Sequence, residues 1–99
     1  MNNVIWKFKV PEGNSQFTFE MPKGAQVLTV QLQEEHLAAP IEPSGWLWAG
    51  CDAEAEKEDR YFLTVGTGIP LGGGLADCKY IGTYQQAGFV WHLFETPTP

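Results

Sequence analysis

The chain has 99 residues, 43% hydrophobic and 13% aromatic, which gives it the size and the material for one compact core. Its net charge of −6 argues against binding to nucleic acid polymers or to anionic membranes, because both activities need a basic surface. No stretch has the apolar length of a signal peptide or a membrane span, so we expect a cytosolic protein with Cys51 and Cys78 reduced.

Alternation of apolar and polar residues, the pattern typical of β-strands, begins close to the N-terminus. Residues 4–10 (VIWKFKV) place their apolar side chains on one face and two lysines on the other, and residues 16–21 (QFTFEM) repeat the pattern. Between them, Pro11, Gly13 and Asn14 have the chemistry of a turn. This arrangement predicts a two-stranded hairpin.

A third strand is predicted for residues 26–33 (QVLTVQLQ), with Leu28, Val30 and Leu32 directed toward the core. Residues 34–43 contain two prolines, so any helix there has at most two turns.

The next strand is predicted for residues 46–51 (WLWAGC), with Trp46 and Trp48 on the same side. Residues 52–60 contain seven ionisable side chains, which indicates a solvated hairpin tip or a short helical turn. Residues 60–65 (RYFLTV) then form the returning strand.

The last two strands are predicted for residues 79–86 and 89–95, joined by a turn at Ala87 and Gly88 and followed by a frayed tail over residues 95–99. The final strand is apolar on both faces. It is therefore either central in its sheet or packed against another subunit, and a homo-oligomer is expected.

About seven short strands at these turn spacings predict a single all-β domain over residues 1–99. We expect an antiparallel β-sandwich or a partly open barrel.

Residues 61–82 hold six of the eleven glycines, so we asked whether they form a phosphate-binding loop. They lack the Lys-Ser/Thr ending of a P-loop, the glycine spacing of a dinucleotide fingerprint and a periodic helix afterwards. Glycines that let the chain bend between strands explain most of the run. What remains is the strand end at Gly66, Thr67 and Gly68, whose backbone amides and hydroxyl are candidates to hold an anion.

Metal and catalytic sites have little support in the sequence. His36, Cys51, Cys78 and His92 match a two-cysteine, two-histidine set in number, but they are scattered and lack the close pairing of metal ligands. A pairing of Cys78 with His92 stays open, although nothing distinguishes it from two unrelated residues. We therefore expect a protein that is not an enzyme and that needs no metal or cofactor.

Four tryptophans exceed what a core of this size encloses, so at least one is expected at the surface. An exposed ring beside a cation is suited to stack on a base. Trp48 and Trp91 are the candidates for that contact, and Arg60 and Lys23 are the candidate cations for phosphate.

The motifs IWKF, MPKGAQVLTVQLQ, LWA, RYFLTVGTGIP, YIGTYQ and FVWHLFE occur in this order between Ile5 and Glu95. In this combination the chain resembles a family of small proteins of unknown function that bacteriophages and prophages encode. The resemblance implies a β-rich fold and an accessory role in the cytoplasm of the host bacterium, and it implies no catalytic residues. Residues 34–43 and 71–78 look like insertions of this chain.

Phage accessory proteins of this size often inhibit host defence, and some sequester nucleotide immune signals in pockets between subunits. By this analogy of role, we expect a binding protein that sequesters a small nucleotide-like signalling molecule. The alternative is a protein-interaction or virion-associated module whose aromatic face binds a protein partner. A hydrolase that degrades such a signal would need a nucleophile or a metal set, which the sequence does not display.

Overall fold

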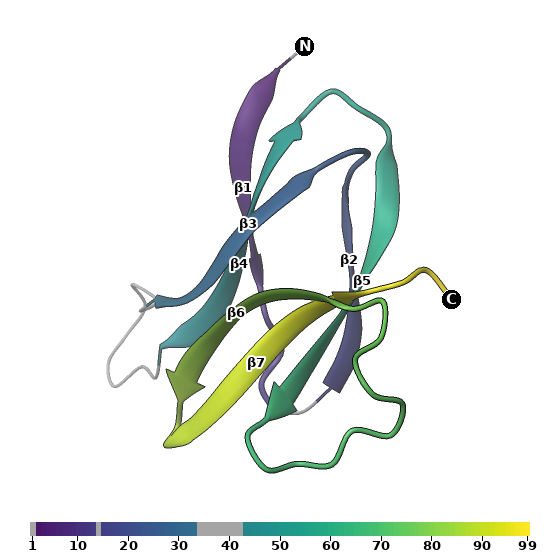
Figure 1. Cartoon of the computed structure of the whole chain (residues 1–99). Coiled ribbons are helices and arrows are strands. Elements are labelled where there is room, and N and C mark those ends of the chain that lie inside the picture. The colour runs from purple at the N-terminus through teal and green to yellow at the C-terminus, as the bar shows by residue number, and fades with distance from the viewer. Residues whose placement is uncertain (1, 14, 34–42) are drawn as a thin grey trace.

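The computed structural model describes residues 2–13, 15–33 and 43–99, which form seven antiparallel strands and contain no helix (Figure 1). In chain order, the strands are β1 (Asn3–Lys9), β2 (Ser15–Pro22), β3 (Gln26–Gln33), β4 (Ser44–Asp52), β5 (Lys57–Gly66), β6 (Lys79–Gln86) and β7 (Phe89–Thr96). The predicted all-β class and the number of strands are confirmed.

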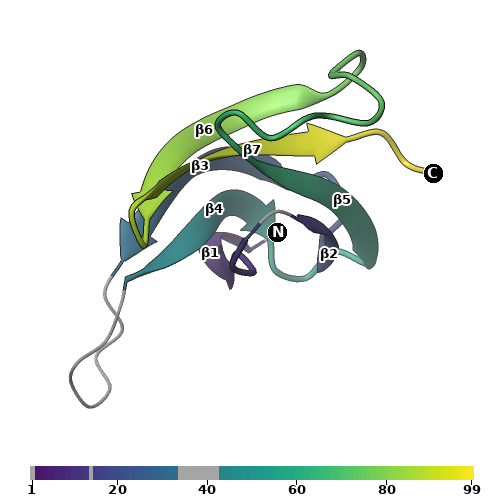
Figure 2. The same ribbon diagram turned by 90° about the horizontal axis from the view of Figure 1, so that it is seen from below.

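The strands form two sheets. Sheet A has the order β1-β4-β3, and sheet B has the order β2-β5-β7-β6. Figure 2 shows sheet B curving over sheet A, so the two sheets enclose the core between them. Strand β7 lies between β5 and β6, and this central position explains why its residues are apolar on both faces.

The core follows from alternation along the central strands. On β4, Leu47, Ala49 and Cys51 are buried, whereas the residues between them are only half-buried. Phe62 on β5 and Leu93 on β7 complete the opposite wall and are almost fully inaccessible. Each large apolar side chain buried in this way contributes about 1.5–3 kcal/mol to folding.

The sheets approach most closely where β6 passes β3. A Cβ atom added at Gly82 would lie 2.8 Å from Cγ1 of Val30, closer than real Cβ contacts come. Glycine at this position therefore lets the two strands pack against each other.

The prediction for β3 was right at Val30 and wrong at Leu28 and Leu32. Val30 is buried, but Leu28 is 46% exposed and Leu32 is also exposed. The pairing of β3 with β4 shifts register between Val27 and Thr29, so Leu28 is an extra residue in a β-bulge. Residues 34–42 lie outside the part of the chain that the structure describes.

Two predicted boundaries were also wrong. The charged run is not the tip of a hairpin, because β4 lies in sheet A and β5 in sheet B. It forms a connection between the sheets that is shorter than expected, because Lys57 and Asp59 already pair with β2 in the antiparallel ladder. The predicted frayed tail is shorter as well, because β7 continues through Glu95 and Thr96. Glu95 is held in place by an ion pair with Arg60.

Candidate functional site

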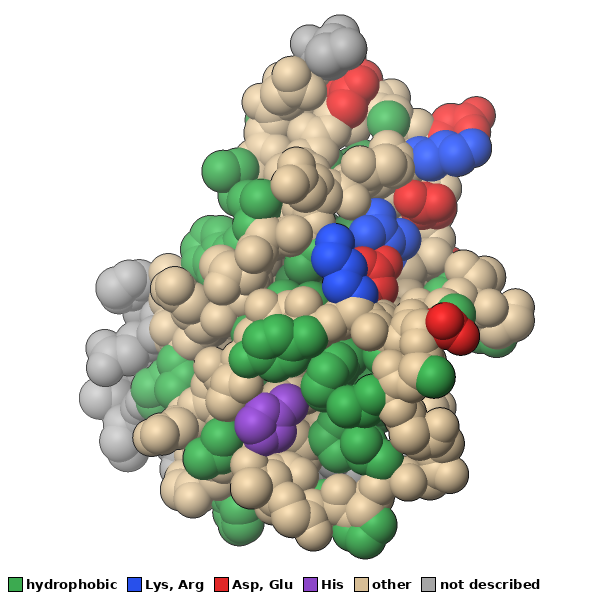
Figure 3. All heavy atoms as spheres, viewed as in Figure 1, with side chains coloured by type: hydrophobic (Ala, Val, Ile, Leu, Met, Phe, Trp, Pro, Cys, Tyr) green, Lys and Arg blue, Asp and Glu red, His purple; other side chains and the backbone are tan. Residues whose placement is uncertain are grey.

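A cavity of about 370 Å³ lies where the glycine-rich loop crosses the outer face of sheet B. Its floor comes from Val65 on β5 and from His92 and Phe94 on β7. The side chains of His92 and Phe94 point away from the core, because Leu93, which lies between them in the strand, points into the core. The loop supplies the rest of the lining, residues Gly66, Thr67, Gly68, Ile69, Leu71 and Leu75. Figure 3 shows hydrophobic side chains gathered around a histidine on this face.

The hairpin of β6 and β7 sets the register of the cavity floor. Ala87 and Gly88 both have positive φ, 52° and 82°, as the two central residues of a type I′ turn require. Counting back from this turn places Thr83 directly opposite His92. A register shift between Tyr80 and Gly82 then brings Tyr80 onto the same face as Thr83, which simple alternation would not do.

The resulting side chains form a continuous line of hydrogen bonds across the outer face. Thr67 Oγ1 lies 2.7 Å from His92 Nε2, and Thr83 Oγ1 lies 3.0 Å from His92 Nδ1. The hydroxyl of Tyr80 lies 2.6 Å from Thr83 Oγ1. Both ring nitrogens of His92 are therefore engaged by hydroxyl groups from two different segments.

Gly66 is the residue that lets the loop close over the sheet. A Cβ atom there would lie 3.1 Å from Cγ1 of Ile69 on one side and 3.1 Å from the Trp91 ring on the other. The turn that follows is held by Thr67, whose amide donates to the carbonyl of Val90 (3.0 Å), and by Ile69, whose amide donates to Gly66 (3.1 Å). The predicted residues Gly66, Thr67 and Trp91 are thus neighbours.

Arg60, the first predicted phosphate ligand, is engaged by the protein itself. Its Nε and Nη2 donate to the two carboxylate oxygens of Glu95 (Nη2 to Oε1, 3.0 Å), and its Nη1 donates to the carbonyl of Ala25 (2.9 Å). The hydrogen bond to Glu95 is the main cause that raises the pKa of Arg60. The guanidinium thereby ties β5 to the end of β7 and to the turn after β2.

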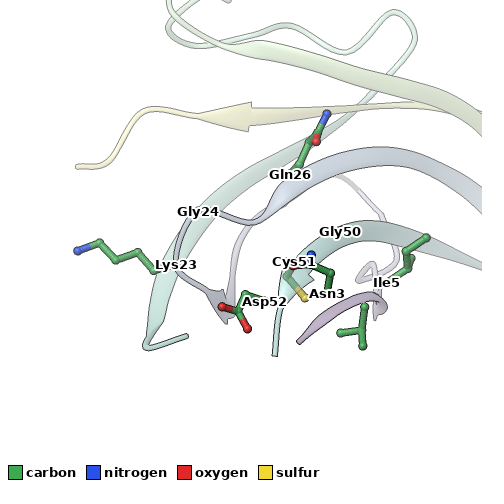
Figure 4. A pocket seen from close by; sticks show the side chains of 9 residues that line it. Asn3, Ile5, Lys23, Gly24, Gln26, Gly50, Cys51 and Asp52 are labelled. Atoms are coloured by element: carbon green, nitrogen blue, oxygen red, sulfur yellow. The ribbon is translucent and has the colours of Figure 1, made fainter. Parts of the chain in front are cut away.

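Lys23, the second predicted cation, lies on the turn between β2 and β3 and lines a larger, separate cavity of about 620 Å³. Its side chain extends away from Gly50 and Cys51 (Figure 4). Asp52 lines the same cavity, and its Oδ1 accepts hydrogen bonds from the backbone amides of Asn2 and Glu54, which lower the pKa of its carboxyl.

Trp48, the other predicted stacking residue, lies on the outer face of sheet A. The ammonium of Lys7 is 5.7 Å from its ring centroid and 4.5 Å from that of Trp46. All four tryptophans are half-buried, but only Trp6 and Trp91 are among the partly buried side chains that pack against the core. Trp91 packs against the core on the inner face of sheet B.

The predicted site residues therefore fall in several places. Gly66 lies six positions after Arg60 on β5, or about 20 Å away at the rise of an extended strand. One phosphate group cannot contact both. The sequence suggested His92 only as a metal ligand or a partner of Cys78, and no motif in it pointed to Thr83 or Tyr80 as site residues.

The described residues also bear on metals, thiols and membranes. No group of three or more His, Cys, Asp or Glu side chains within them could hold a metal ion, and His36 lies outside them. Both cysteines are free, and burial raises the pKa of the Cys51 thiol. No helix in this part of the chain could cross a membrane.

Comparison with known proteins identifies a family. A model described as "Domain of unknown function (DUF7352)" matches residues 1–99, so the chain belongs to this family. No curated protein and no solved structure matches the chain. The family description assigns no activity, ligand or partner. A function can therefore be proposed only from the geometry of the site.

Proposed function

We propose that this member of the DUF7352 family is a non-enzymatic binding protein that sequesters a small nucleotide-like signalling molecule. The observation that carries the proposal is the cavity under the glycine-rich loop. Its volume, about 370 Å³, falls within the usual range for small-molecule sites of roughly 300–1,000 Å³. Its lining is mostly apolar with a few polar groups, Thr67 and His92, that converge on one side.

This cavity offers two kinds of contact to a nucleotide. Phe94, Ile69 and Leu71 provide an apolar surface for a base or ribose. Thr67 and His92 provide hydrogen-bonding groups for a phosphate. We therefore assign phosphate recognition to the Gly66 end of β5, and Arg60 a role in holding the fold together.

The biological role we propose is that of a bacteriophage accessory protein acting in the cytoplasm of the host. Removing a signal by binding counters a nucleotide-dependent defence without catalysis. A homo-oligomer fits this role, because Phe89 beside the turn of the β6–β7 hairpin is 62% exposed and offers apolar surface to a second subunit.

Native mass spectrometry of the purified protein tests this proposal. The protein is measured alone and with a pool of cyclic oligonucleotides and cyclic ADP-ribose isomers. We expect the mass of one intact nucleotide for each cavity, on a species of two or more subunits. Conversion of the nucleotide by the pure protein would contradict the non-enzymatic assignment.

A second candidate function is docking of a protein partner, and the exposed apolar side chains favour it. Those of the loop and of the β6–β7 hairpin are Ile69, Leu71, Leu75, Tyr80 and Phe89. Such a group of exposed side chains on one domain is typical of an interaction surface. A protein that binds no member of the nucleotide pool would favour this function.

A further inference from the structure

The line of hydrogen bonds through His92 has a restricted number of proton arrangements. It joins four groups, Tyr80, Thr83, His92 and Thr67, by three hydrogen bonds. A neutral imidazole brings one N–H hydrogen and each hydroxyl brings one, so four hydrogens serve three bonds. One hydrogen is left over and must point away from the line.

Three arrangements satisfy all three bonds when His92 is neutral. In one, Tyr80 donates to Thr83, Thr83 donates to Nδ1, and Nε2–H donates to Thr67, which leaves the hydroxyl hydrogen of Thr67 free. In the other two, Nδ1–H donates to Thr83 and Thr67 donates to Nε2. The bond between Tyr80 and Thr83 can then run in either direction, so the free hydrogen is that of Tyr80 or that of Thr83. An acceptor placed beside Thr67 therefore selects the first arrangement.

A proton added to His92 strengthens this preference. Both ring nitrogens then donate, to Thr67 and to Thr83, and no hydrogen bond of the line is lost. The hydroxyl hydrogen of Thr67 is again free, and a positive charge lies directly behind it. Thr67 and His92 both line the cavity, so an acceptor bound there can lie beside this hydrogen.

Among the residues that the structure describes, no carboxylate lines the cavity to neutralise this positive charge. None of the described residues that line the cavity is Asp, Glu, Lys or Arg, and Tyr80 is the other titratable group on the line. On the neighbouring segments, Asp77, Lys79 and Glu95 line a different cavity together with Arg60. An anionic group on the ligand would therefore be the partner of a charged His92.

We infer that a phosphate oxygen of the ligand accepts a hydrogen bond from Thr67 and that His92 takes up a proton when the ligand binds. This inference rests on the proposed function for the kind of ligand. It adds the group that binds the phosphate and the dependence of the affinity on pH. Histidine is the side chain whose charge ordinarily changes between about pH 5 and 8, so affinity should rise as pH falls. Because only one proton is taken up, the affinity can change by at most about tenfold per pH unit.

Calorimetry with cyclic AMP and adenosine tests the inference on the intact protein. Cyclic AMP carries one phosphodiester charge at every pH used, so any pH dependence comes from the protein, and adenosine is the matched ligand without phosphate. We expect cyclic AMP to bind more tightly at about pH 5.5 than at about pH 8. Adenosine should bind weakly and equally at both.

Three variants locate the effect. Thr67→Val removes the hydroxyl at nearly constant shape and should weaken cyclic AMP binding about tenfold or more. His92→Gln cannot gain a charge and should abolish the pH dependence. Lys23→Ala, which removes a positive charge outside the cavity, is the matched control and should leave the affinity unchanged.

The ¹⁵N chemical shifts of the His92 ring provide a readout on the unmodified protein. At neutral pH, cyclic AMP should move both ring nitrogens toward the doubly protonated form. Binding of cyclic AMP with neither this change nor a loss in Thr67→Val and His92→Gln would overturn the inference and leave the proposed function standing. A response to inorganic phosphate but to no nucleotide would support the anion site and contradict the proposed function. No binding of phosphate or of any nucleotide would overturn both the inference and the proposed function.

Discussion

The two ends of β5 carry the residues that the sequence suggested for phosphate, and they differ in how their polar groups are used. At the first end, Arg60 donates to both oxygens of Glu95 and to the carbonyl of Ala25. At the other end, Gly66 leads into a loop where Thr67 meets His92. The first end is closed by protein partners, whereas the second keeps one hydrogen that its own hydrogen bonds cannot use.

This difference separates structural from binding roles better than charge does. A guanidinium whose donors are taken by a carboxylate and a carbonyl must lose those bonds before it can hold a ligand. A hydroxyl with an unused hydrogen beside an open cavity gains a bond when an acceptor arrives. We therefore expect substitutions at the two ends to affect different measurements.

The largest effect is expected for Arg60→Ala. The side chains of Arg60 and Glu95 are 19% and 17% exposed, so the variant leaves a mostly buried carboxylate without its partner. We expect a loss of about 2–3 kcal/mol in the free energy of unfolding, measured by urea denaturation. Arg60→Lys keeps the charge without the two-pronged geometry and should lose less. A large loss of nucleotide affinity at unchanged stability would instead make Arg60 a ligand-binding residue.

The next effect concerns Tyr84, which lies on the inner face of sheet B opposite Trp91 and is 6% exposed. Burial raises the pKa of its phenol from 10 to about 12. The unfolded chain therefore ionises first, and stability is present in full below pH 10 and falls as pH rises toward about 12.

Over that window the loss is about 2–3 kcal/mol, and denaturation midpoints measured across it should show the decline. Tyr84→Phe is the matched variant, because it keeps the ring and removes the ionisable group. A decline of equal size in this variant would assign the alkaline loss to other groups.

A smaller effect is expected for Gly66→Ala. The added methyl group would press on Ile69 and Trp91, so the loop should lift from the sheet at a cost of about 1–2 kcal/mol. Ligand affinity should fall with it. Gly72→Ala is the control, because its Cβ atom would meet nothing within 4 Å and its φ is not positive. Equal effects of the two variants on thermal unfolding would contradict the role given to Gly66.

The smallest effect on stability is expected for Thr83→Val, about 0.5 kcal/mol, because the two hydrogen bonds it removes, to Tyr80 and to His92, are both exposed. The effect on His92 should nevertheless be clear. Without Thr83, only the bond between Nε2 and Thr67 remains to select a tautomer, so the ring ¹⁵N shifts should change. Unchanged shifts would show that Thr83 does not orient the ring.

Much of the fold could be predicted from the sequence because alternation reports directly which face of a strand is buried. It predicted the buried faces of β1, β2 and β4, where the pattern is regular. It did not predict the pairing: the expected hairpin of β1 with β2 is wrong, because β1 pairs with β4 and β2 pairs with β5 in the other sheet. It failed at Leu28, because a bulge adds a residue without any marker in the sequence. The same limitation hid Tyr80, which a second bulge moves to the face of Thr83.

The candidate site was predictable in part. The glycines at the end of β5 pointed to Gly66, Thr67 and Gly68. The register implied by the turn at Ala87 and Gly88 contained the pairing of Thr83 with His92, although sequence reasoning did not use it. Whether Arg60 is available could not be predicted, because its partner Glu95 is 35 positions away and is brought to it by the fold.

The most direct test of the difference between the two ends of β5 is an NMR titration with the nucleotide that the protein retains, following both the backbone amides and the ring signals of His92. The account predicts the largest changes at Gly66, Thr67 and Gly68 and in the ring signals of His92, with Arg60 and Ala25 unaffected. Changes centred on Arg60 and Ala25, with the loop unaffected, would contradict it.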